Sequence, residues 1–443
     1  MGVVDANVLV LNLDFQPLNV CNVRRAVVLL SKEKASVVEQ NGHLITSERL
    51  SFPSPSVIRL AYHVKRPRPV VKMTRKEVLV RDDHTCQYCG RRGHDVRVVC
   101  GQAFDDRRVF MSEGVEVVQV KPRGGFLGVV ADASTLVDLM RTDVLEWYAE
   151  DRDLIHNIGR EYLDSSLEVG ETLGTPIVLT PLAHRGQFHG GDTPSDFARY
   201  RRADAITTMT DWEKGWFASE GVDAERIVTT GMGPNAVRSR DGLAFRAAHG
   251  IPADAPLVLY IGRKERYKGY IHLLDAAEVV WRRHPDTRFV FIGIPGFYSS
   301  FVDEFARYAD ERIVDIERAS GAEKSAALDA CDVFAMPSVH ETFGIGYLEA
   351  WLHERPVVGG DIPPLREVIA DGVDGFCVRQ RAGDVASAIQ RLLDDPGLRS
   401  SMGRAGAQKL REKWDWERVI DRVEEAYARA LAHAHADVGE ALA

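Results

Sequence analysis

Short runs of β-branched and other apolar residues recur through the middle of the chain, separated by polar and helical stretches. Strands are predicted at residues 96–100, 115–120, 154–158, 176–180, 205–210 and 227–230. Helices are predicted between several of them, for example over residues 134–147 and 211–220. Alternating strands and helices are typical of a parallel sheet whose two faces are covered by helices. The middle of the chain is therefore expected to form an α/β domain.

A second series of apolar runs starts near Pro256. The expected strands contain, in order, the stretches LVLYIGR, RFVFIGI, DVFAMPS, PVVGGD and FCVR. Between the first two, apolar residues from Leu273 to Trp281 follow helical spacing and predict a helix with one buried face. We therefore expect a second α/β domain, joined to the first by residues 234–256, and a helical stretch from Trp414 onward.

The first ninety residues have a different character. Residues 7–12 predict a strand and residues 23–30 a helix, whereas residues 63–71 are basic, proline-rich and expected to be extended. Residues 1–92 hold 15 basic and 8 acidic residues, a net +7 in a chain whose total is −9. The rest therefore carries −16, and this asymmetry suggests two modules with different partners. A basic module could contact nucleic-acid phosphates, although such an excess is also common on a plain solvated surface.

Composition narrows the class of protein. A chain of 443 residues with 45% apolar and 27% charged residues is typical of a globular protein of two or three domains. No apolar run approaches the roughly 18 residues that would span a bilayer. The N-terminus lacks the basic flank of a signal peptide, and six cysteines are too few for a disulfide scaffold. A cytoplasmic location is therefore predicted.

The first chemical motif, IGRKERYKG over residues 261–269, directly follows a predicted buried strand. Ligands of open α/β sheets bind beyond the carboxyl ends of the strands, where this loop is expected to lie. Its glycines let the backbone approach a ligand, and Arg263 with Lys268 would bring two positive charges to one diphosphate. A solvated basic loop is the alternative interpretation.

The second motif, ETFGIGYLE over residues 341–349, follows the strand DVFAMPS and opens a helix. N–H groups near Phe343 and Gly344 would then face the ligand edge of the sheet as an anion site. Glu341 in the loop and Glu349 in the helix could accept hydrogen bonds from sugar and ribose hydroxyls. Two surface glutamates on a helix are the alternative.

In this order and strand context, the two motifs resemble those of family-4 glycosyltransferases, which have the GT-B fold. The G-R-x4-K-G loop and the E-x7-E element are both intact, and PVVGGD and DGVDGF are similar to further landmarks of that family. The resemblance covers about residues 91–430. It implies two Rossmann-like domains, here residues 91–236 and 237–418, followed by a helical tail over residues 419–443. A nucleotide-diphosphate sugar would bind in the cleft between the two domains.

The resemblance also implies roles for individual residues. Those assigned to the donor diphosphate are Arg263, Lys268, Phe343 and Gly344. Glu349 is assigned to the ribose and Glu341 to the transferred sugar. Members of the family retain the anomeric configuration and need no metal or other cofactor, because the two cations neutralise the diphosphate. The implied acceptor is a sugar, a lipid or a small molecule.

The first α/β domain supplies a candidate catalytic histidine. His184 follows the stretch PIVLT and is placed like the family's histidine near the transferred sugar, with a loop histidine lacking any role as the alternative. His156 and His189 are weaker candidates. The family's first strand, glycine-rich loop and first helix are missing before residue 91. We expect this loss to leave donor binding intact and to impair transfer.

Residues 7–90 resemble the leader of HNH-type endonucleases. The similarity rests on the stretches VLVLN, QPLNV, RRAV, VKRPRP and RDDHTCQYCG. The metal-binding catalytic core that follows in those proteins is missing. Cys86 and Cys89 provide one pair of zinc ligands, which His94 and Cys100 could complete; two free thiols are the alternative. The expected organisation is a fusion, with a small α+β appendage over residues 1–90.

These observations favour a glycosyltransferase that uses a nucleotide-diphosphate sugar. A sugar-nucleotide binder without catalysis is the first alternative, because the glycine-rich loop is missing. The second alternative is a DNA-binding protein derived from an HNH endonuclease, which the basic N-terminal module favours.

Overall fold

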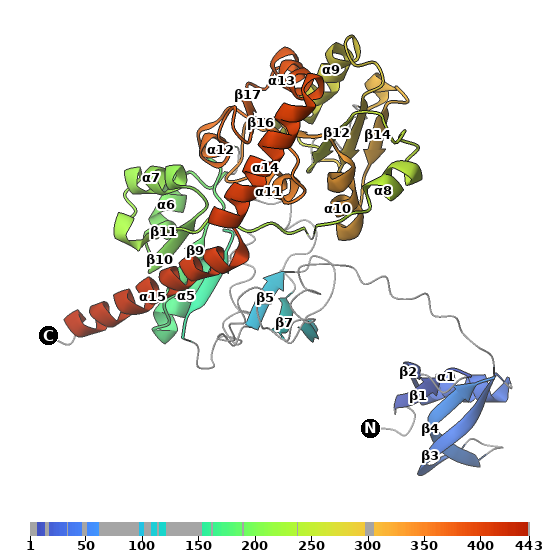
Figure 1. Ribbon diagram of the computed structural model, residues 1–443. Coiled ribbons are helices and arrows are strands. Elements are labelled where there is room, and N and C mark those ends of the chain that lie inside the picture. The colour runs from blue at the N-terminus through green and yellow to red at the C-terminus, as the bar shows by residue number, and fades with distance from the viewer. Residues whose placement is uncertain are drawn as a thin grey trace. The chain divides into compact units, whose positions relative to one another are not determined.

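In the computed structural model the chain forms two units, residues 1–71 and 72–443 (Figure 1). Each unit has a hydrophobic core of its own. The described residues are 7–13, 17–32, 34–46, 51–61, 97–101, 108–112, 115–120, 153–160, 163–187, 190–236, 238–296 and 305–441.

The first unit is a four-stranded sheet with one helix. Its strands β1 (Asn7–Leu11), β2 (Pro17–Asn22), β3 (Ala35–Thr46) and β4 (Ser51–Leu60) lie in the order β2-β1-β4-β3. β1 is antiparallel to β2 and parallel to β4. α1 (Val23–Ser31) begins where the Asn22 side chain accepts a hydrogen bond from the backbone N–H of Arg25. The core of the unit consists of Val8, Val10, Val23, Ala26, Ile58 and Leu60. The predicted first strand and helix are confirmed.

Three short strands form a sheet of their own. β5 (Arg97–Gly101), β6 (Arg108–Ser112) and β7 (Val115–Val120) lie in the order β5-β7-β6. β7 is parallel to β5 and antiparallel to β6. Only two residues connect β6 to β7, too few for a parallel crossover, so this pair is antiparallel. The prediction that residues 96–100 and 115–120 join the first Rossmann-like sheet is therefore wrong for the described strands. The helix predicted over residues 134–147 lies outside the described residues.

The next sheet is entirely parallel. β8 (Ile155–Ile158), β9 (Ile177–Thr180), β10 (Ala205–Thr208) and β11 (Ile227–Thr229) lie in the order β11-β10-β9-β8. α5 (Leu163–Leu173), α6 (Pro194–Tyr200) and α7 (Asp211–Ser219) connect them. Among the described residues, no strand pairs with the outer edge of β8. An aromatic group, Phe197, Tyr200, Trp216 and Phe217, fills the core beneath α6 and α7.

The second parallel sheet has six strands. β12 (Leu257–Ile261), β13 (Arg288–Ile292), β14 (Ile313–Ile316), β15 (Val333–Met336), β16 (Val357–Gly360) and β17 (Gly375–Val378) lie in the order β14-β13-β12-β15-β16-β17. The strand order therefore reverses between β12 and β15, which is where doubly wound sheets bind ligands.

Helices cover the six-stranded sheet on both faces. They are α8 (Gly242–Ala248), α9 (Tyr270–Trp281), α10 (Gly321–Ala330), α11 (Ile345–Leu352), α12 (Pro363–Val368), α13 (Ala382–Asp394) and α14 (Pro396–Lys413). Leu273 and Val280 of α9 are fully buried, as the helical spacing predicts, whereas Trp281 is only partly buried.

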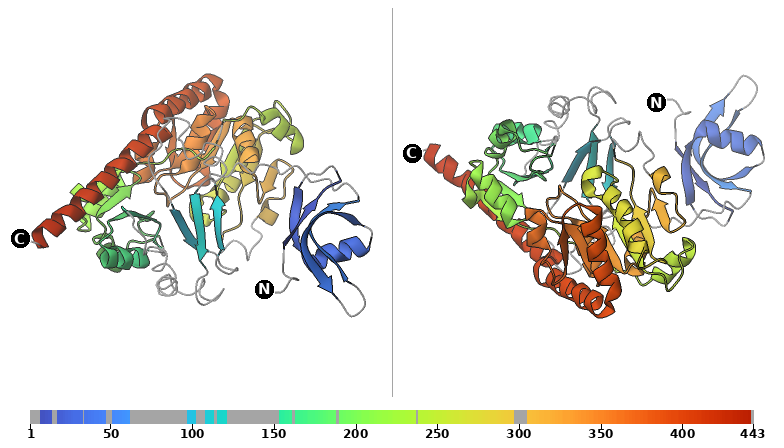
Figure 2. Two further views of the ribbon diagram at one scale, coloured as in Figure 1. Left: turned by 90° about the horizontal axis from the view of Figure 1, so that it is seen from below. Right: turned by 90° about the horizontal axis from the view of Figure 1, so that it is seen from above.

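The C-terminal helix returns to the first of the two parallel sheets. α14 packs on α11, and after Trp414 the chain continues as α15 (Trp416–Ala441), which lies along β9, β10 and β11 (Figure 2). Ala426 and Ala430 of α15 pack against Val178 and Val228 of the sheet. Residues 416–441 therefore cover a face of the four-stranded sheet, as an integral layer of that domain.

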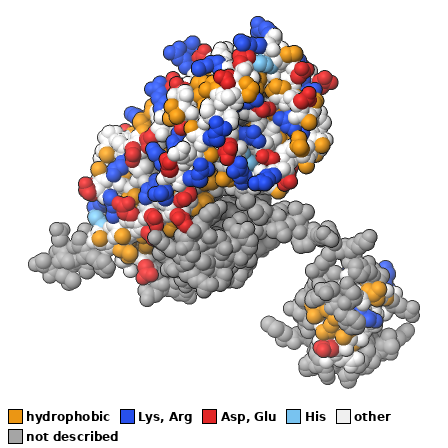
Figure 3. All heavy atoms as spheres, viewed as in Figure 1, with side chains coloured by type: hydrophobic (Ala, Val, Ile, Leu, Met, Phe, Trp, Pro, Cys, Tyr) orange, Lys and Arg blue, Asp and Glu red, His pale blue; other side chains and the backbone are white. Residues whose placement is uncertain are grey.

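Charges of both signs are interspersed on the face of the second unit shown in Figure 3, among its described residues. No described helix is both long enough and apolar enough to cross a membrane.

Candidate functional site

The backbone of the loop after β12 is held in place by hydrogen bonds to the Tyr260 side chain and to β13. The Tyr260 hydroxyl donates to the carbonyl of Arg263 (2.7 Å), and Gly262 N–H donates to the carbonyl of Ile292 on β13 (3.0 Å). Gly269 closes the loop with a φ of 83°, and a Cβ there would lie 2.5 Å from the carbonyl oxygen of Pro337. Both the left-handed conformation and the close approach require glycine at this position.

The cations of this loop have different environments. Lys264 is buried and paired with Asp315 on β14, with its ammonium 5.1 Å from the centre of the Phe305 ring. Arg263 is exposed, and its guanidinium donates to the Tyr267 hydroxyl (3.1 Å). Lys268 is partly buried and pairs with Glu341 from the loop after β15. Lys264 thus pairs with β14, whereas Lys268 pairs with the loop after β15.

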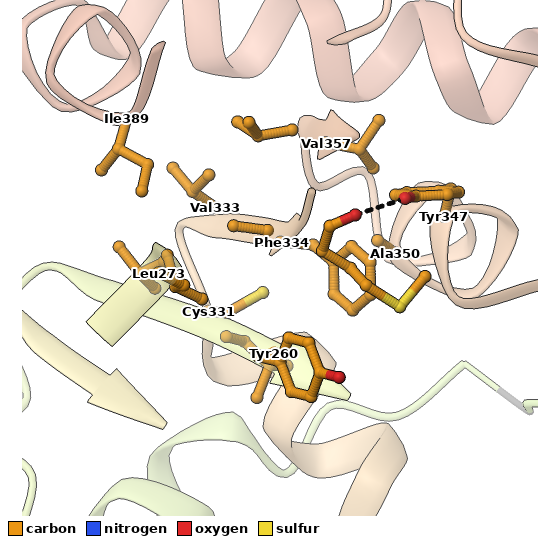
Figure 4. Close-up of a cluster of buried hydrophobic side chains, with 14 of the residues drawn as sticks. Tyr260, Leu273, Cys331, Val333, Phe334, Tyr347, Ala350, Val357 and Ile389 are labelled. Atoms are coloured by element: carbon orange, nitrogen blue, oxygen red, sulfur yellow. Dashed lines mark hydrogen bonds between the residues drawn. The ribbon is translucent and has the colours of Figure 1, made fainter. Parts of the chain in front are cut away.

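The loop after β15 begins α11 beside these cations. Gly344 precedes the helix with a φ of 80°, and the Tyr347 hydroxyl donates to the carbonyl of Met336 (2.5 Å), which ties the first turn of α11 to the end of β15 (Figure 4). Phe343 is buried and meets Trp414 edge to face at 5.2 Å. The first N–H groups of a helix have no partner within it, and eight residues lie between the end of β15 and the start of α11. That these N–H groups bind an anion stays a prediction.

His184 comes from the other parallel sheet. Burial lowers the pKa of its imidazole, the Lys268 ammonium and Arg160 add to this effect, and the Glu341 carboxylate opposes it. These influences place His184 in the electrostatic neighbourhood of Lys268 and Glu341. The structure therefore pairs a carboxylate with an ammonium group at one sheet, and their charges influence the imidazole that follows β9 of the other sheet.

Glu349 lies in the second turn of α11 and is partly buried. Burial raises the pKa of its carboxyl group, opposed by the Lys324 ammonium and by a hydrogen bond from the backbone of Asn235. Asn235 belongs to the segment that joins the two sheets. The His353 ring contacts the backbone of Glu349, with its Nδ1 3.0 Å from the Glu349 carbonyl oxygen. Its Nε2 accepts a hydrogen bond from Ser239 N–H (3.1 Å).

Other candidates from the sequence lie elsewhere. His156 is hydrogen-bonded to Thr180 Oγ1 (2.7 Å) and to the Tyr427 hydroxyl on α15 (3.0 Å), and burial lowers its pKa to about 4. It therefore links the sheet to α15. His189, His94, Cys86 and Cys89 lie outside the described residues, and Cys100 is on β5. The described residues contain no group of three or more His, Cys, Asp or Glu side chains that could hold a metal.

Trp414 is a residue of the site that sequence reasoning missed. Its indole stacks 6.4 Å from that of Trp351, and a Cβ added to Gly231 would lie 2.7 Å from it. Trp414 therefore packs between the loop that holds Phe343 and the chain just after β11. Its place at the start of the predicted C-terminal helical stretch carried no such signal, because Phe343 and Gly231 are both distant in sequence.

Family models match three parts of the chain. "Glycosyl transferases group 1" matches residues 243–409, "Glycosyl transferase 4-like domain" residues 83–233, and "HNH endonuclease-associated, N-terminal domain" residues 8–68. The two resemblances inferred from the sequence are thereby confirmed.

Among curated proteins, a D-inositol 3-phosphate glycosyltransferase of Corynebacterium aurimucosum is 31% identical over 222 residues, which are 48% of this chain and 51% of that protein. An alpha-maltose-1-phosphate synthase of Mycobacterium tuberculosis is 29% identical over 197 residues, 41% of this chain and 50% of that protein. The chain thus spans about half the length of these relatives.

Solved structures show the same fold. Sucrose-phosphate synthase from Thermosynechococcus elongatus superposes with a TM-score of 0.64 at 19% identity, covering 80% of this chain and 93% of that one. Anabaena HepE, solved with UDP and glucose, superposes with a TM-score of 0.59 at 20% identity, covering 71% and 87%. The fold is therefore GT-B, as expected. The chain is thus similar to group 1 glycosyl transferases over residues 243–409, to a glycosyl transferase 4-like domain over residues 83–233 and to an HNH endonuclease-associated domain over residues 8–68.

Proposed function

We propose that the protein transfers a sugar from a nucleotide-diphosphate sugar to a hydroxyl acceptor, with retention of the anomeric configuration. The observation that carries this proposal is the Lys268–Glu341 ion pair, which joins the loops after β12 and β15 where the strand order reverses. Clustered charged and neutral polar groups at such a point are suited to a ligand that combines a diphosphate with a sugar.

In the proposed reaction, the bond between the anomeric carbon and the diphosphate oxygen breaks, and the acceptor oxygen bonds to the same carbon from the same side. Negative charge grows on the departing diphosphate. Arg263, Lys268 and the N–H groups that open α11 would stabilise this charge, because they are fixed before the reaction begins. The acceptor proton would pass to the departing oxygen. In this proposal the two cations take the place of a metal ion.

The three groups around the transferred sugar would have separate tasks. The Glu341 carboxylate can accept hydrogen bonds from sugar hydroxyls while it keeps Lys268 oriented. An ammonium group has three donors, so Lys268 can bind a phosphate oxygen without leaving Glu341. The lowered pKa of His184 keeps its imidazole neutral near pH 7, so one ring nitrogen can accept and the other can donate.

The first test is calorimetric titration of UDP, GDP and ADP into the protein. We expect one of them to bind at micromolar concentration, and Arg263→Ala to weaken it at least tenfold, since a charge-assisted bond contributes about 1.5–3 kcal/mol. Arg404→Ala, which removes an exposed arginine of α14, is the matched control. If the folded protein binds none of the three nucleotides, the proposal is wrong.

Glu349 is tested with the matching nucleoside diphosphate and its 2′,3′-dideoxy analogue. If the carboxylate holds the ribose, Glu349→Ala and removal of the two hydroxyls will weaken binding by similar factors, and the combination will add little. Additive losses would remove Glu349 from the ribose site.

Two alternatives follow from particular observations. The unpaired edge of β8, among the described residues, agrees with a truncated domain that binds the donor without transferring it. Nucleotide binding without release of free nucleotide from any donor and acceptor pair would favour that alternative. The match to an HNH endonuclease-associated domain at residues 8–68 supports DNA binding, for which a salt-dependent mobility shift is the test. A cytoplasmic location remains a prediction.

A further inference from the structure

The two loops at the proposed donor site are joined through one backbone carbonyl. The carbonyl oxygen of Tyr267 accepts hydrogen bonds from Val339 N–H (2.9 Å) and from the Ser338 hydroxyl (3.2 Å). Ser338 is fully buried, and its hydroxyl also lies 3.0 Å from the carbonyl oxygen of His340. Tyr267 directly precedes Lys268, and His340 directly precedes Glu341. The junction therefore adjoins both members of the ion pair.

A third element reaches this junction. Gln380 follows β17, the outermost strand of the six-stranded sheet on that side, and its side-chain nitrogen donates to the carbonyls of Tyr267 (2.9 Å) and Pro337 (2.7 Å). A primary amide has two N–H donors, so both are used by these two bonds. One carbonyl belongs to the loop after β12 and the other to the loop after β15. Gln380 thus ties the two loops together from outside both.

The two carbonyls flank the lysine closely. Tyr267 is the residue before Lys268, and Pro337 packs so tightly on Gly269 that a Cβ there would lie 2.5 Å from its carbonyl oxygen. Without the amide, each of these carbonyl oxygens would lose a donor, while Val339 N–H and the Ser338 hydroxyl would still bond to Tyr267. The spacing of the two loops would then loosen, and Lys268 would shift relative to Glu341.

We propose that Gln380 is a positioning residue for the donor diphosphate: it fixes the spacing of the two loops so that Lys268 and the start of α11 address the same phosphates. This inference rests on the proposed function for its consequence, and on the hydrogen bonds of Gln380 for its structural part. Gln380 itself lies outside the set of residues proposed to touch the donor.

The test compares two substitutions with a matched control. Gln380→Met keeps the length of the side chain and removes both donors, and Gln380→Glu places a carboxylate against two carbonyl oxygens. The control is Gln390→Met, because the Gln390 amide also donates to a backbone carbonyl, that of Val279 (3.0 Å), and joins α13 to α9 in the same domain. A general loss of domain stability would affect Gln390→Met as well.

The first measurement is hydrogen–deuterium exchange without nucleotide. Gln380→Met is expected to raise exchange in peptides covering residues 264–270 and 337–342, while Gln390→Met leaves them at the wild-type rate. Equal exchange in the wild type and in Gln380→Met would overturn the inference, whether or not the protein binds a nucleotide.

The second measurement is the affinity for the nucleoside diphosphate that binds the wild type, compared with its monophosphate. Gln380→Met should weaken the diphosphate about 5- to 10-fold, equivalent to one hydrogen-bonding group, and the monophosphate much less. Gln380→Glu should weaken it further, and Gln390→Met should leave it unchanged. Equal losses for the two nucleotides would contradict positioning toward the diphosphate. No binding by the wild type would refute the proposed function and leave the exchange result to decide on Gln380.

Discussion

The Lys268 ammonium is paired with the Glu341 carboxylate, although 73 residues separate them, and their side chains are only 16% and 6% exposed. Removing one partner of such a pair leaves the other desolvated without compensation. The pair therefore couples the first motif to the second before any ligand arrives.

Glu341→Gln should separate binding from transfer. The amide still accepts from Lys268 and from sugar hydroxyls, so the affinity for the nucleoside diphosphate should stay within about threefold. If the proposed mechanism holds, transfer should fall about 100-fold, because a fixed negative charge beside the transferred sugar would be lost. Glu425→Gln, which breaks a surface pair with Arg429, is the control. Unchanged transfer in Glu341→Gln would remove this residue from the proposed mechanism.

Gly269→Ala should disturb the loop after β12 in two ways, through its left-handed backbone conformation and through a collision with Pro337. Gly372 has a similar φ, 77° against 83°, but nothing within 4 Å of an added Cβ. Gly372→Ala should therefore cost about 1–2 kcal/mol in unfolding free energy from the left-handed conformation alone. Gly269→Ala should cost more and should also weaken nucleotide binding at least tenfold. Chemical denaturation and calorimetry on both variants distinguish conformational strain from the collision with Pro337.

Glu213 should make the protein less stable as the pH rises. Burial raises the pKa of this α7 carboxyl to about 8 from an ordinary value near 4.5. The folded state therefore holds a proton that the unfolded state has lost, and unfolding free energy falls between about pH 4.5 and pH 8.

Glu213→Gln should accordingly stabilise the protein at pH 8 by a few kcal/mol and have little effect near pH 5. The amide oxygen can still accept from Met209 N–H, as the carboxylate does at 2.7 Å. Glu220→Gln, at the exposed end of the same helix, is the control. Identical pH profiles of Glu213→Gln and the wild type would show that the carboxyl is ionised when folded.

His156 should make the protein less stable as the pH falls, the opposite of the effect of Glu213. Because burial lowers its pKa to about 4, the unfolded state takes up a proton first as the pH falls below 6.5. The neutral His156 therefore contributes about 3 kcal/mol to the unfolding free energy above pH 6.5, and this contribution is lost as the pH falls to about 4. In His156→Gln the loss of stability over this window should be smaller. A steep decline retained in His156→Gln would contradict the assignment.

The sequence predicted the parts of the site that are continuous in the chain. The residues 261–269 and 341–349 each follow a buried strand, so their placement at the sheet edge followed from the strand alone. The partners of β5 and β7 were not predictable, because β-propensity does not specify which strand a segment pairs with. The partners of His156 and Gln380 could not be predicted, because Tyr427 is 271 residues from His156 and Tyr267 is 113 residues from Gln380.

The return of α15 to the four-stranded sheet has a consequence for biosynthesis. The Arg429 guanidinium donates to the carbonyl of Glu225, 204 residues earlier, and Ala426 and Ala430 complete the burial of Val178 and Val228. While the chain is being synthesised, this apolar face emerges from the ribosome long before the helix that covers it. A nascent chain that stalls within the six-stranded domain would expose the face, and it is then a natural binding surface for chaperones.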